Sequence, residues 1–254
     1  MRSEYFSFDG KNSLEMGYYS ARIADVEAQQ ELLGDRKVKT ATFGNKTYNY
    51  INQIETSPIE FTLQIIPTQD RQWTIEMFRN VCDWLIQDEY KPFISEDDPS
   101  KVFYAIAQGH TNWKGVMLYG YIEIDFTTNA YHAWTLPKVV EYNIEGKQTI
   151  YVENLKNVSD RIYSPVIHIT KTKQAGDISI SNKSNNGKTT ILYKINKGED
   201  FVMNNEYHLF QTETPKNYYG ESFNGVWLDL VPGRNKLEVD GDCTLEFRLQ
   251  FPIV

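Results

Sequence analysis

The chain has 254 residues and a net charge of −8 at pH 7, with 41% hydrophobic and 24% charged residues. These proportions exclude an intrinsically disordered chain and suit one large domain or two ordinary ones. The negative charge argues against a protein that binds nucleic acid by neutralising its phosphates.

The N-terminal residues Met1–Phe6 lack the apolar core of a signal peptide. No run approaches the roughly 20 apolar residues that a membrane-spanning helix needs. We therefore expect synthesis in a cytoplasm without a classical export signal. Cys82 and Cys243 lie far apart in the sequence and predict no disulfide framework.

The first half of the chain predicts strands around a single helix. Apolar residues alternate with polar ones in the strand expected at 59–65: Ile59, Phe61, Leu63 and Ile65. A helix is expected over 73–86, with Thr68 or Asp70 as its N-cap. Its core face has the spacing i, i+3, i+4, i+7: Phe78, Val81, Cys82 and Leu85. The polar segment Gly34–Lys39 predicts an arm or hairpin that reaches a neighbouring copy.

The alternation stops after Trp134, which places the domain boundary there and gives domains 1–134 and 135–254. Short strands at a spacing of roughly 8–12 residues in the second half predict a sandwich or jelly roll. Ser222–Asp240 is expected to be a β-hairpin, because alternating apolar residues flank the turn at Pro232–Asn235. Trp227 lies on the opposite face of its first strand.

No catalytic constellation is evident. The histidines are scattered: His110, His132, His168 and His208. The most acidic loops hold carboxylates typical of solvated turns: Glu96, Asp97, Asp98, Asp240 and Asp242. We therefore predict no catalytic residue, metal or cofactor. Three aromatic residues remain as candidate contacts for a sugar or a partner: Tyr218, Tyr219 and Trp227.

Three segments follow one another in an informative order. Phe6–Gly17 contains an aromatic-x-aromatic-Asp-Gly turn and a Met-Gly step, the strand and helix of residues 59–86 follow, and Trp227–Leu237 comes near the end. Together they resemble the distal tail proteins of siphophages that infect Gram-positive bacteria, the Dit family, and are close to that of a Bacillus siphophage. The resemblance covers essentially the whole chain.

The resemblance implies a mainly β fold. Its N-terminal domain is β-barrel-like with one α-helix and a β-hairpin arm, and its C-terminal domain is a jelly-roll β-sandwich similar to galectins and carbohydrate-binding modules. It also implies a hexameric ring, single or doubled back to back into a dodecamer, at the virion tail tip. This ring joins the tail-tube protein to the tail-associated tip protein and the host adsorption apparatus.

Members of this family have no catalytic residues, and DNA passes through the ring. The negative charge of the chain predicts a neutral or acidic lumen to which DNA does not adhere. The alternative function is a carbohydrate-binding protein that recognises bacterial cell-wall glycan through the C-terminal sandwich. A wall hydrolase is the least supported class, because no carboxylate pair stands out.

Overall fold

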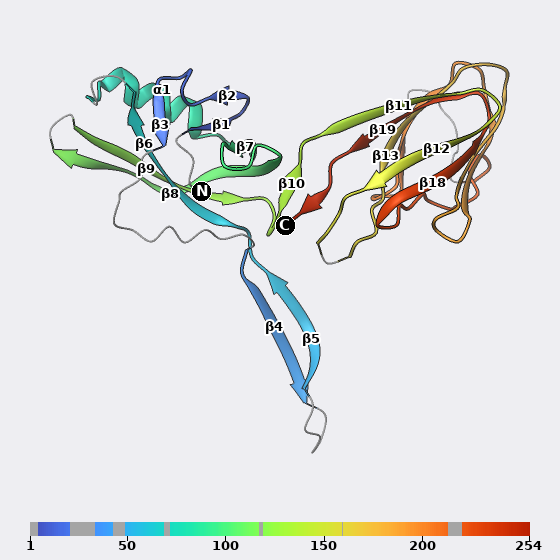
Figure 1. Cartoon of the computed structure of the whole chain (residues 1–254), viewed down its shortest axis with the longest axis horizontal. Helices are drawn as coiled ribbons and strands as arrows, with labels where there is room; N and C mark the ends of the chain where they lie inside the picture. Colours follow the sequence, from blue (N-terminus) through green and yellow to red (C-terminus); the bar gives the residue numbers. More distant parts are fainter. Residues whose placement is uncertain are drawn as a thin grey trace. The chain divides into compact units, whose positions relative to one another are not determined.

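The computed structural model describes residues 5–20, 34–42, 49–68, 72–116, 119–158, 160–212 and 220–254. The chain folds into two compact units, residues 1–135 with Val254 and residues 136–253 (Figure 1). The boundary expected from the sequence lay after Trp134. Strands dominate both units and one helix is described, which confirms the mainly β fold class.

The described residues of the first unit include one helix, and most of its described strands join a single antiparallel sheet. Its elements are β1 (Phe6–Phe8), β2 (Lys11–Asn12), β3 (Tyr18–Ser20), β4 (Arg36–Thr42), β5 (Asn49–Thr56), β6 (Glu60–Pro67), α1 (Ile75–Leu85), β7 (Lys91–Ser95), β8 (Lys101–Val116), β9 (Tyr119–Thr128) and β10 (Ala133–Thr135). The main path of the sheet has the order β2-β1-β7-β8-β9-β6-β3, and β10 pairs with β8. The strand expected at 59–65 is β6, and it continues through Pro67.

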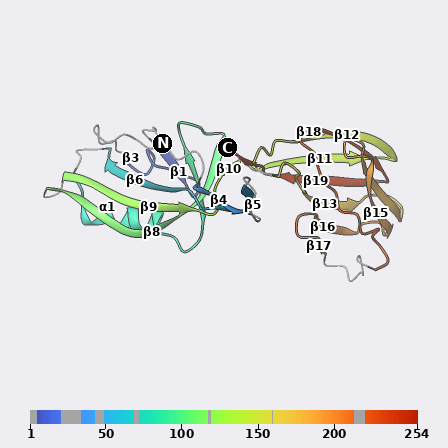
Figure 2. The same cartoon turned by 90° about the horizontal axis from the view of Figure 1, so that it is seen from below.

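Helix α1 covers one side of the sheet (Figure 2), and its buried residues Val81, Trp84 and Leu85 join the core of the first unit. The indole nitrogen of Trp84 donates to the Phe8 carbonyl at 3.0 Å, which ties the helix to β1. The N-cap predictions were wrong. Thr74 caps the helix, because its hydroxyl accepts a hydrogen bond from the amide of Met77 at 3.2 Å.

The opposite side of this sheet is polar. On β6 and β9, the hydroxyl of Thr62 donates to Asp125 at 2.6 Å and the amide of Gln64 donates to Glu123 at 3.1 Å. Lys114 on β8 pairs with Glu123 at 2.6 Å. That hydrogen bond lowers the pKa of Glu123 despite the opposing effect of burial. We call Thr62, Gln64, Lys114, Glu123 and Asp125 the polar face.

Strands β4 and β5 form a separate two-stranded sheet, and we call this hairpin the arm (Figure 1). Its root is held by backbone hydrogen bonds from Gly34 to Tyr131 and from Ser57 to Asp35, at 3.0 and 2.9 Å. A Cβ added to Gly34 would lie 1.8 Å from the Ser57 carbonyl oxygen, so no other residue fits here without a backbone shift. A hairpin therefore begins within the segment for which the sequence predicted one.

The second unit is a sandwich of two antiparallel sheets. Its strands are β11 (Lys138–Ile144), β12 (Lys147–Asn154), β13 (Val166–Lys171), β14 (Gly176–Asn182), β15 (Lys188–Ile195), β16 (Asp200–Asn204), β17 (Leu209–Gln211), β18 (Gly233–Asp240), β19 (Cys243–Leu249) and β20 (Pro252–Ile253). One sheet has the order β11-β19-β13-β16-β17 and the other β12-β18-β14-β15. Alternate residues of both sheets, such as Ile169, Ile180 and Phe247, build a common core.

The outer edges of the smaller sheet are capped by side chains. On β12, the hydroxyl of Tyr142 donates to the Tyr151 carbonyl at 2.6 Å. On β15, the side chain of Asn224 accepts from the Ile191 amide at 3.1 Å and donates to the Thr189 carbonyl at 2.9 Å. Tyr142 thus takes a position that a further strand would occupy on β12, and on β15 the Asn224 side chain does so beside backbone hydrogen bonds to residues 222–224.

Thr190 on β15 is the buried side chain whose hydroxyl has no partner among the described atoms. Thr190→Val keeps the shape and removes the cost of the unpaired group, so we expect stability to rise by about 1 kcal/mol. Chemical denaturation measures this difference. The neighbouring Thr189→Val is the matched control and should destabilise, because the Thr189 hydroxyl lies 2.8 Å from the Gly187 carbonyl it donates to. A loss of stability in Thr190→Val would contradict the prediction.

Candidate functional site

Of the three aromatic residues singled out in the sequence, Trp227 alone lies within the described part of the chain. Tyr218 and Tyr219 lie outside the described residues. The indole of Trp227 stacks on His208 with ring centroids 4.9 Å apart, and it also contacts Phe210 and Phe223. Trp227 therefore packs at the border of the sandwich core, with the His208 ring parallel to it. A partner or sugar contact at Trp227 stays a prediction.

Residues 226–230 are not a strand, so the predicted hairpin over Ser222–Asp240 is wrong. Within this stretch, Leu230 makes only an isolated bridge to Tyr163. The second half of the expected hairpin, β18, pairs instead with β12 and β14. The alternation of Val226, Leu228 and Leu230 reflects burial on one side and not membership of a sheet.

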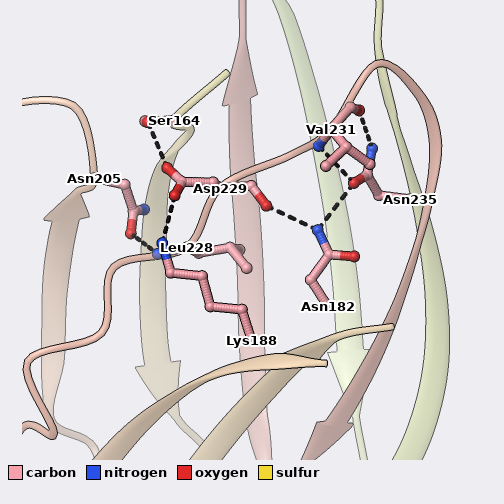
Figure 3. Close-up of polar contacts among 8 residues, drawn as sticks. All are labelled: Ser164, Asn182, Lys188, Asn205, Leu228, Asp229, Val231 and Asn235. Atoms are coloured by element: carbon pink, nitrogen blue, oxygen red, sulfur yellow. Dashed lines mark hydrogen bonds and ion pairs between the residues drawn. The ribbon is translucent and has the colours of Figure 1, made fainter. Parts of the chain in front are cut away.

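Buried asparagine side chains take the place of a partner strand along this segment (Figure 3). Asn205 accepts a hydrogen bond from the Leu228 amide at 2.7 Å, and Asn182 donates to the Asp229 carbonyl at 2.8 Å. Asn154 donates to the Leu230 carbonyl at 2.9 Å. All three asparagines are at most 3% exposed. They satisfy backbone groups that would otherwise be buried without partners.

Asn235 is the centre of this asparagine network. Its amide oxygen accepts from the Val231 amide and from Asn182, both at 2.9 Å. Its amide nitrogen donates to the carbonyls of Val231 and Gly233, at 2.7 and 3.0 Å. Asn235 is fully buried and uses its oxygen and nitrogen twice each. It closes the turn that carries the chain from the extended segment into β18.

Asp229 fixes the outer side of the same segment. Its carboxylate accepts from the hydroxyl of Ser164 at 2.8 Å and from the ammonium of Lys188 at 2.6 Å (Figure 3). The two donors come from different parts of the sandwich, so this carboxylate acts as a structural crosslink. Nothing in the sequence pattern marked these asparagines or Asp229, because their partners lie up to 76 residues away.

The residues considered for catalysis do not converge. His168 contacts Asp200 at 2.9 Å on an exposed strand face, and Asp98 is held in its turn by Ser100 and Lys101. Asp242 accepts a hydrogen bond from the Gly146 amide at 3.0 Å. In the described part of the chain, no three His, Cys, Asp or Glu side chains gather as a metal site would require. No helix among those residues is long and apolar enough to cross a membrane.

The two cysteines are free and differ in accessibility. Burial raises the pKa of Cys243 to about 11, and burial together with Asp83 raises the pKa of Cys82. We therefore expect slow reaction with a thiol reagent near pH 8, with half-buried Cys82 modified first and Cys243 only after the second unit unfolds. Timed labelling and mass spectrometry check this order, and Cys82→Ser identifies the first site. Faster labelling of Cys243 would contradict it.

The arm offers a second candidate site, an apolar face with no described partner in its own chain. Register pairs Val38 with Ile54 and Thr40 with Ile51, and Val38 and Thr40 lie two residues apart on one strand. Side chains at these positions share one face of the hairpin. Val38, Ile51 and Ile54 are 48%, 65% and 42% exposed, and we call them the apolar face of the arm. The opposite face is polar and includes an ion pair between Lys39 and Glu55.

Comparisons with known proteins agree with this architecture. A family model described as a phage tail protein N-terminal domain matches residues 1–130, and one described as a phage tail C-terminal domain matches residues 132–249. A search of curated proteins finds no match.

Two of the similar solved structures are phage tail components. One is SPP1 Dit, described as a paradigm of the hub adsorption apparatus in phages that infect Gram-positive bacteria. Its TM-score is 0.65 at 13% identity, over 97% of this chain and 98% of that chain. The other is a chain of the phage P2 baseplate in its activated conformation, with a TM-score of 0.51 at 7% identity over 98% of both chains.

These matches define the protein as a component of a phage tail. The chain belongs to the family of phage tail proteins that the two domain models describe. Its fold is that of SPP1 Dit along almost its whole length. The resemblance inferred from the sequence is confirmed.

Proposed function

We propose that this protein is the structural hub of a phage tail tip. Six copies form a ring that joins the tail-tube protein to the tail-associated tip protein and the adsorption apparatus. A second ring, back to back, would give the dodecamer. The protein acts by binding and not by catalysis. The observation that carries the proposal is the arm, which exposes an apolar face on a chain with the fold of a tail hub component.

A ring of identical copies requires two different surfaces on each subunit, one of which docks on the other in the next copy. The arm supplies one of these two surfaces, because its exposed apolar face would be costly to leave in water. Its root is tied to the rest of the first unit by the hydrogen bond from the Gly34 amide to the Tyr131 carbonyl, and the Ser57 amide closes the root by donating to the Asp35 carbonyl. We therefore assign ring closure to the first unit.

The polar face is the candidate wall of the lumen. Its carboxylates, Glu123 and Asp125, outnumber its ammonium group, Lys114, which is already paired. A phosphate backbone gains nothing by contact with such a surface, because no counterions are released. DNA could then pass without adhering.

The charge of this wall is testable in assembled rings. Glu123→Lys with Asp125→Lys should produce rings that retain duplex DNA at low salt and release it as salt rises, whereas the unaltered rings should retain none. A gel-shift assay over a salt series measures both. Glu141→Lys with Glu246→Lys, two changes on the second unit, is the charge-matched control. Equal retention by both double variants would contradict the assignment.

The mass and symmetry of the purified protein test the hub itself. Light scattering and negative-stain microscopy should show six-fold rings of six or twelve copies, alone or with the tube protein added. A chain that stays monomeric under both conditions would overturn the proposal. Binding to wall polysaccharide that is lost in Tyr218→Ala or Tyr219→Ala would instead establish the glycan-binding alternative.

A further inference from the structure

Two asparagines of this chain precede glycine, Asn186 and Asn224. This sequence favours a spontaneous reaction in which the backbone nitrogen of the glycine attacks the side-chain amide carbon. Glycine permits the reaction because it has no side chain to obstruct the approach. The two sites share the Asn-Gly pair, so the difference between their structures decides which one reacts faster in the folded protein.

Asn186 lies at the exposed tip of the turn between β14 and β15. Its side chain makes no hydrogen bond to any described residue. Its φ is +50° and that of Gly187 is +70°, values that asparagine and glycine tolerate better than other residues. Apart from its chain neighbours, no atom lies within 4 Å of a Cβ built on Gly187, so the space beside this residue is open. One turn hydrogen bond, from the Gly187 amide to the Asn182 carbonyl at 3.0 Å, has to open.

Asn224 is held at every polar atom of its side chain. Its oxygen accepts from the amides of Ile191 and Val226, at 3.1 and 3.2 Å, and its nitrogen donates to the Thr189 carbonyl at 2.9 Å. Rotation of this side chain toward the Gly225 nitrogen breaks the cap on the edge of β15. Reaction at this site therefore requires local unfolding of the sheet edge.

We propose that Asn186 is a site of spontaneous deamidation and that Asn224 is protected by its edge-capping role. In the reaction, a bond forms between the Gly187 nitrogen and the Asn186 side-chain carbon, and the bond from that carbon to its amide nitrogen breaks. The leaving amide nitrogen takes up the proton lost by the Gly187 nitrogen and departs as ammonia, and a cyclic imide remains. Water then opens the imide at either carbonyl, which gives aspartate or isoaspartate at position 186.

Formation of isoaspartate at position 186 disturbs the asparagine network. In isoaspartate the main chain runs through the side-chain carbons of residue 186. The turn just before Gly187 therefore becomes longer. The Asn182 carbonyl accepts from the Gly187 amide, and the Asn182 side chain holds both Asp229 and Asn235. Lengthening the turn displaces the Gly187 amide from Asn182. Chemical ageing at an exposed tip thereby loosens a buried network of the second unit.

Peptide mapping by mass spectrometry tests the site in the full chain, incubated in mildly alkaline buffer either folded or unfolded in guanidinium. In the folded protein we expect conversion at Asn186 to be several-fold faster than at Asn224. In the unfolded chain the two rates should converge, because each asparagine precedes glycine. Equal rates in the folded protein, or faster reaction at Asn224, would overturn the proposal.

The effect on the network has its own test. Asn186→Gly removes the reactive amide and keeps a residue suited to positive φ. After identical incubation, the unaltered protein should lose thermal stability and Asn186→Gly should not. Fresh Asn186→Asp introduces the charge without the lengthened backbone and should resemble the unaged protein. Unchanged stability of the isoaspartate fraction would overturn the link to the network.

Discussion

Asn235→Ala is expected to destabilise the second unit by roughly 3–5 kcal/mol, because buried backbone groups lose their partners. The alanine leaves the amide of Val231 and the carbonyls of Val231 and Gly233 without their side-chain hydrogen bonds. It also removes one of the two acceptors of the Asn182 amide. Guanidinium denaturation followed by tryptophan fluorescence measures the difference.

Two further variants sharpen this test. Asn235→Asp places a carboxylate oxygen against two carbonyl oxygens, so its loss of stability should be at least as large near neutral pH and smaller in acid, where the protonated group donates once. Asn143→Ala, at an exposed position on β11, is the control and should cost less than about 1 kcal/mol. Equal effects at positions 143 and 235 would show that the network does not hold the segment.

Substitution of the apolar face of the arm should abolish ring assembly and leave both units folded. In the variant Val38→Lys, Ile51→Lys, Ile54→Lys, three ammonium groups replace side chains that the proposed interface buries. Burying unpaired charges costs far more than an interface of this kind gains. We expect a monomer by light scattering, with an unchanged circular dichroism spectrum and melting temperature.

The opposite face of the arm supplies a matched control. Lys37→Ala, Lys39→Ala and Gln53→Ala alter the same hairpin on its polar side and should leave the rings intact. Loss of rings in both variants would indicate that the arm acts through its general stability. Intact rings in the lysine variant would remove the arm from the interface.

Local patterns predicted local structure well. The alternation over residues 59–65 became β6. The helix was expected in the correct place, but its N-cap was not. Several Thr and Asp residues precede the helix, and only the side chain of Thr74 reaches the Met77 amide.

Pairing between distant segments was not predictable in the same way. Residues 226–230 alternate as a strand does, yet Asn182 and Asn205 satisfy their backbone from elsewhere in the sandwich. A buried asparagine has the same appearance in a sequence as one in a solvated turn. The surroundings of the candidate aromatic site could not be predicted for the same reason, because nothing in the sequence placed His208 against Trp227.

The capped edges of the smaller sheet have a consequence for the lifetime of an assembled particle. Where identical sandwiches stand side by side at very high local concentration, an open sheet edge can recruit the same edge of its neighbour and begin irreversible aggregation. Tyr142 and Asn224 occupy backbone sites along both edges, so that recruitment first requires their displacement. Crowded copies can therefore remain separate modules, each free to meet its own partner.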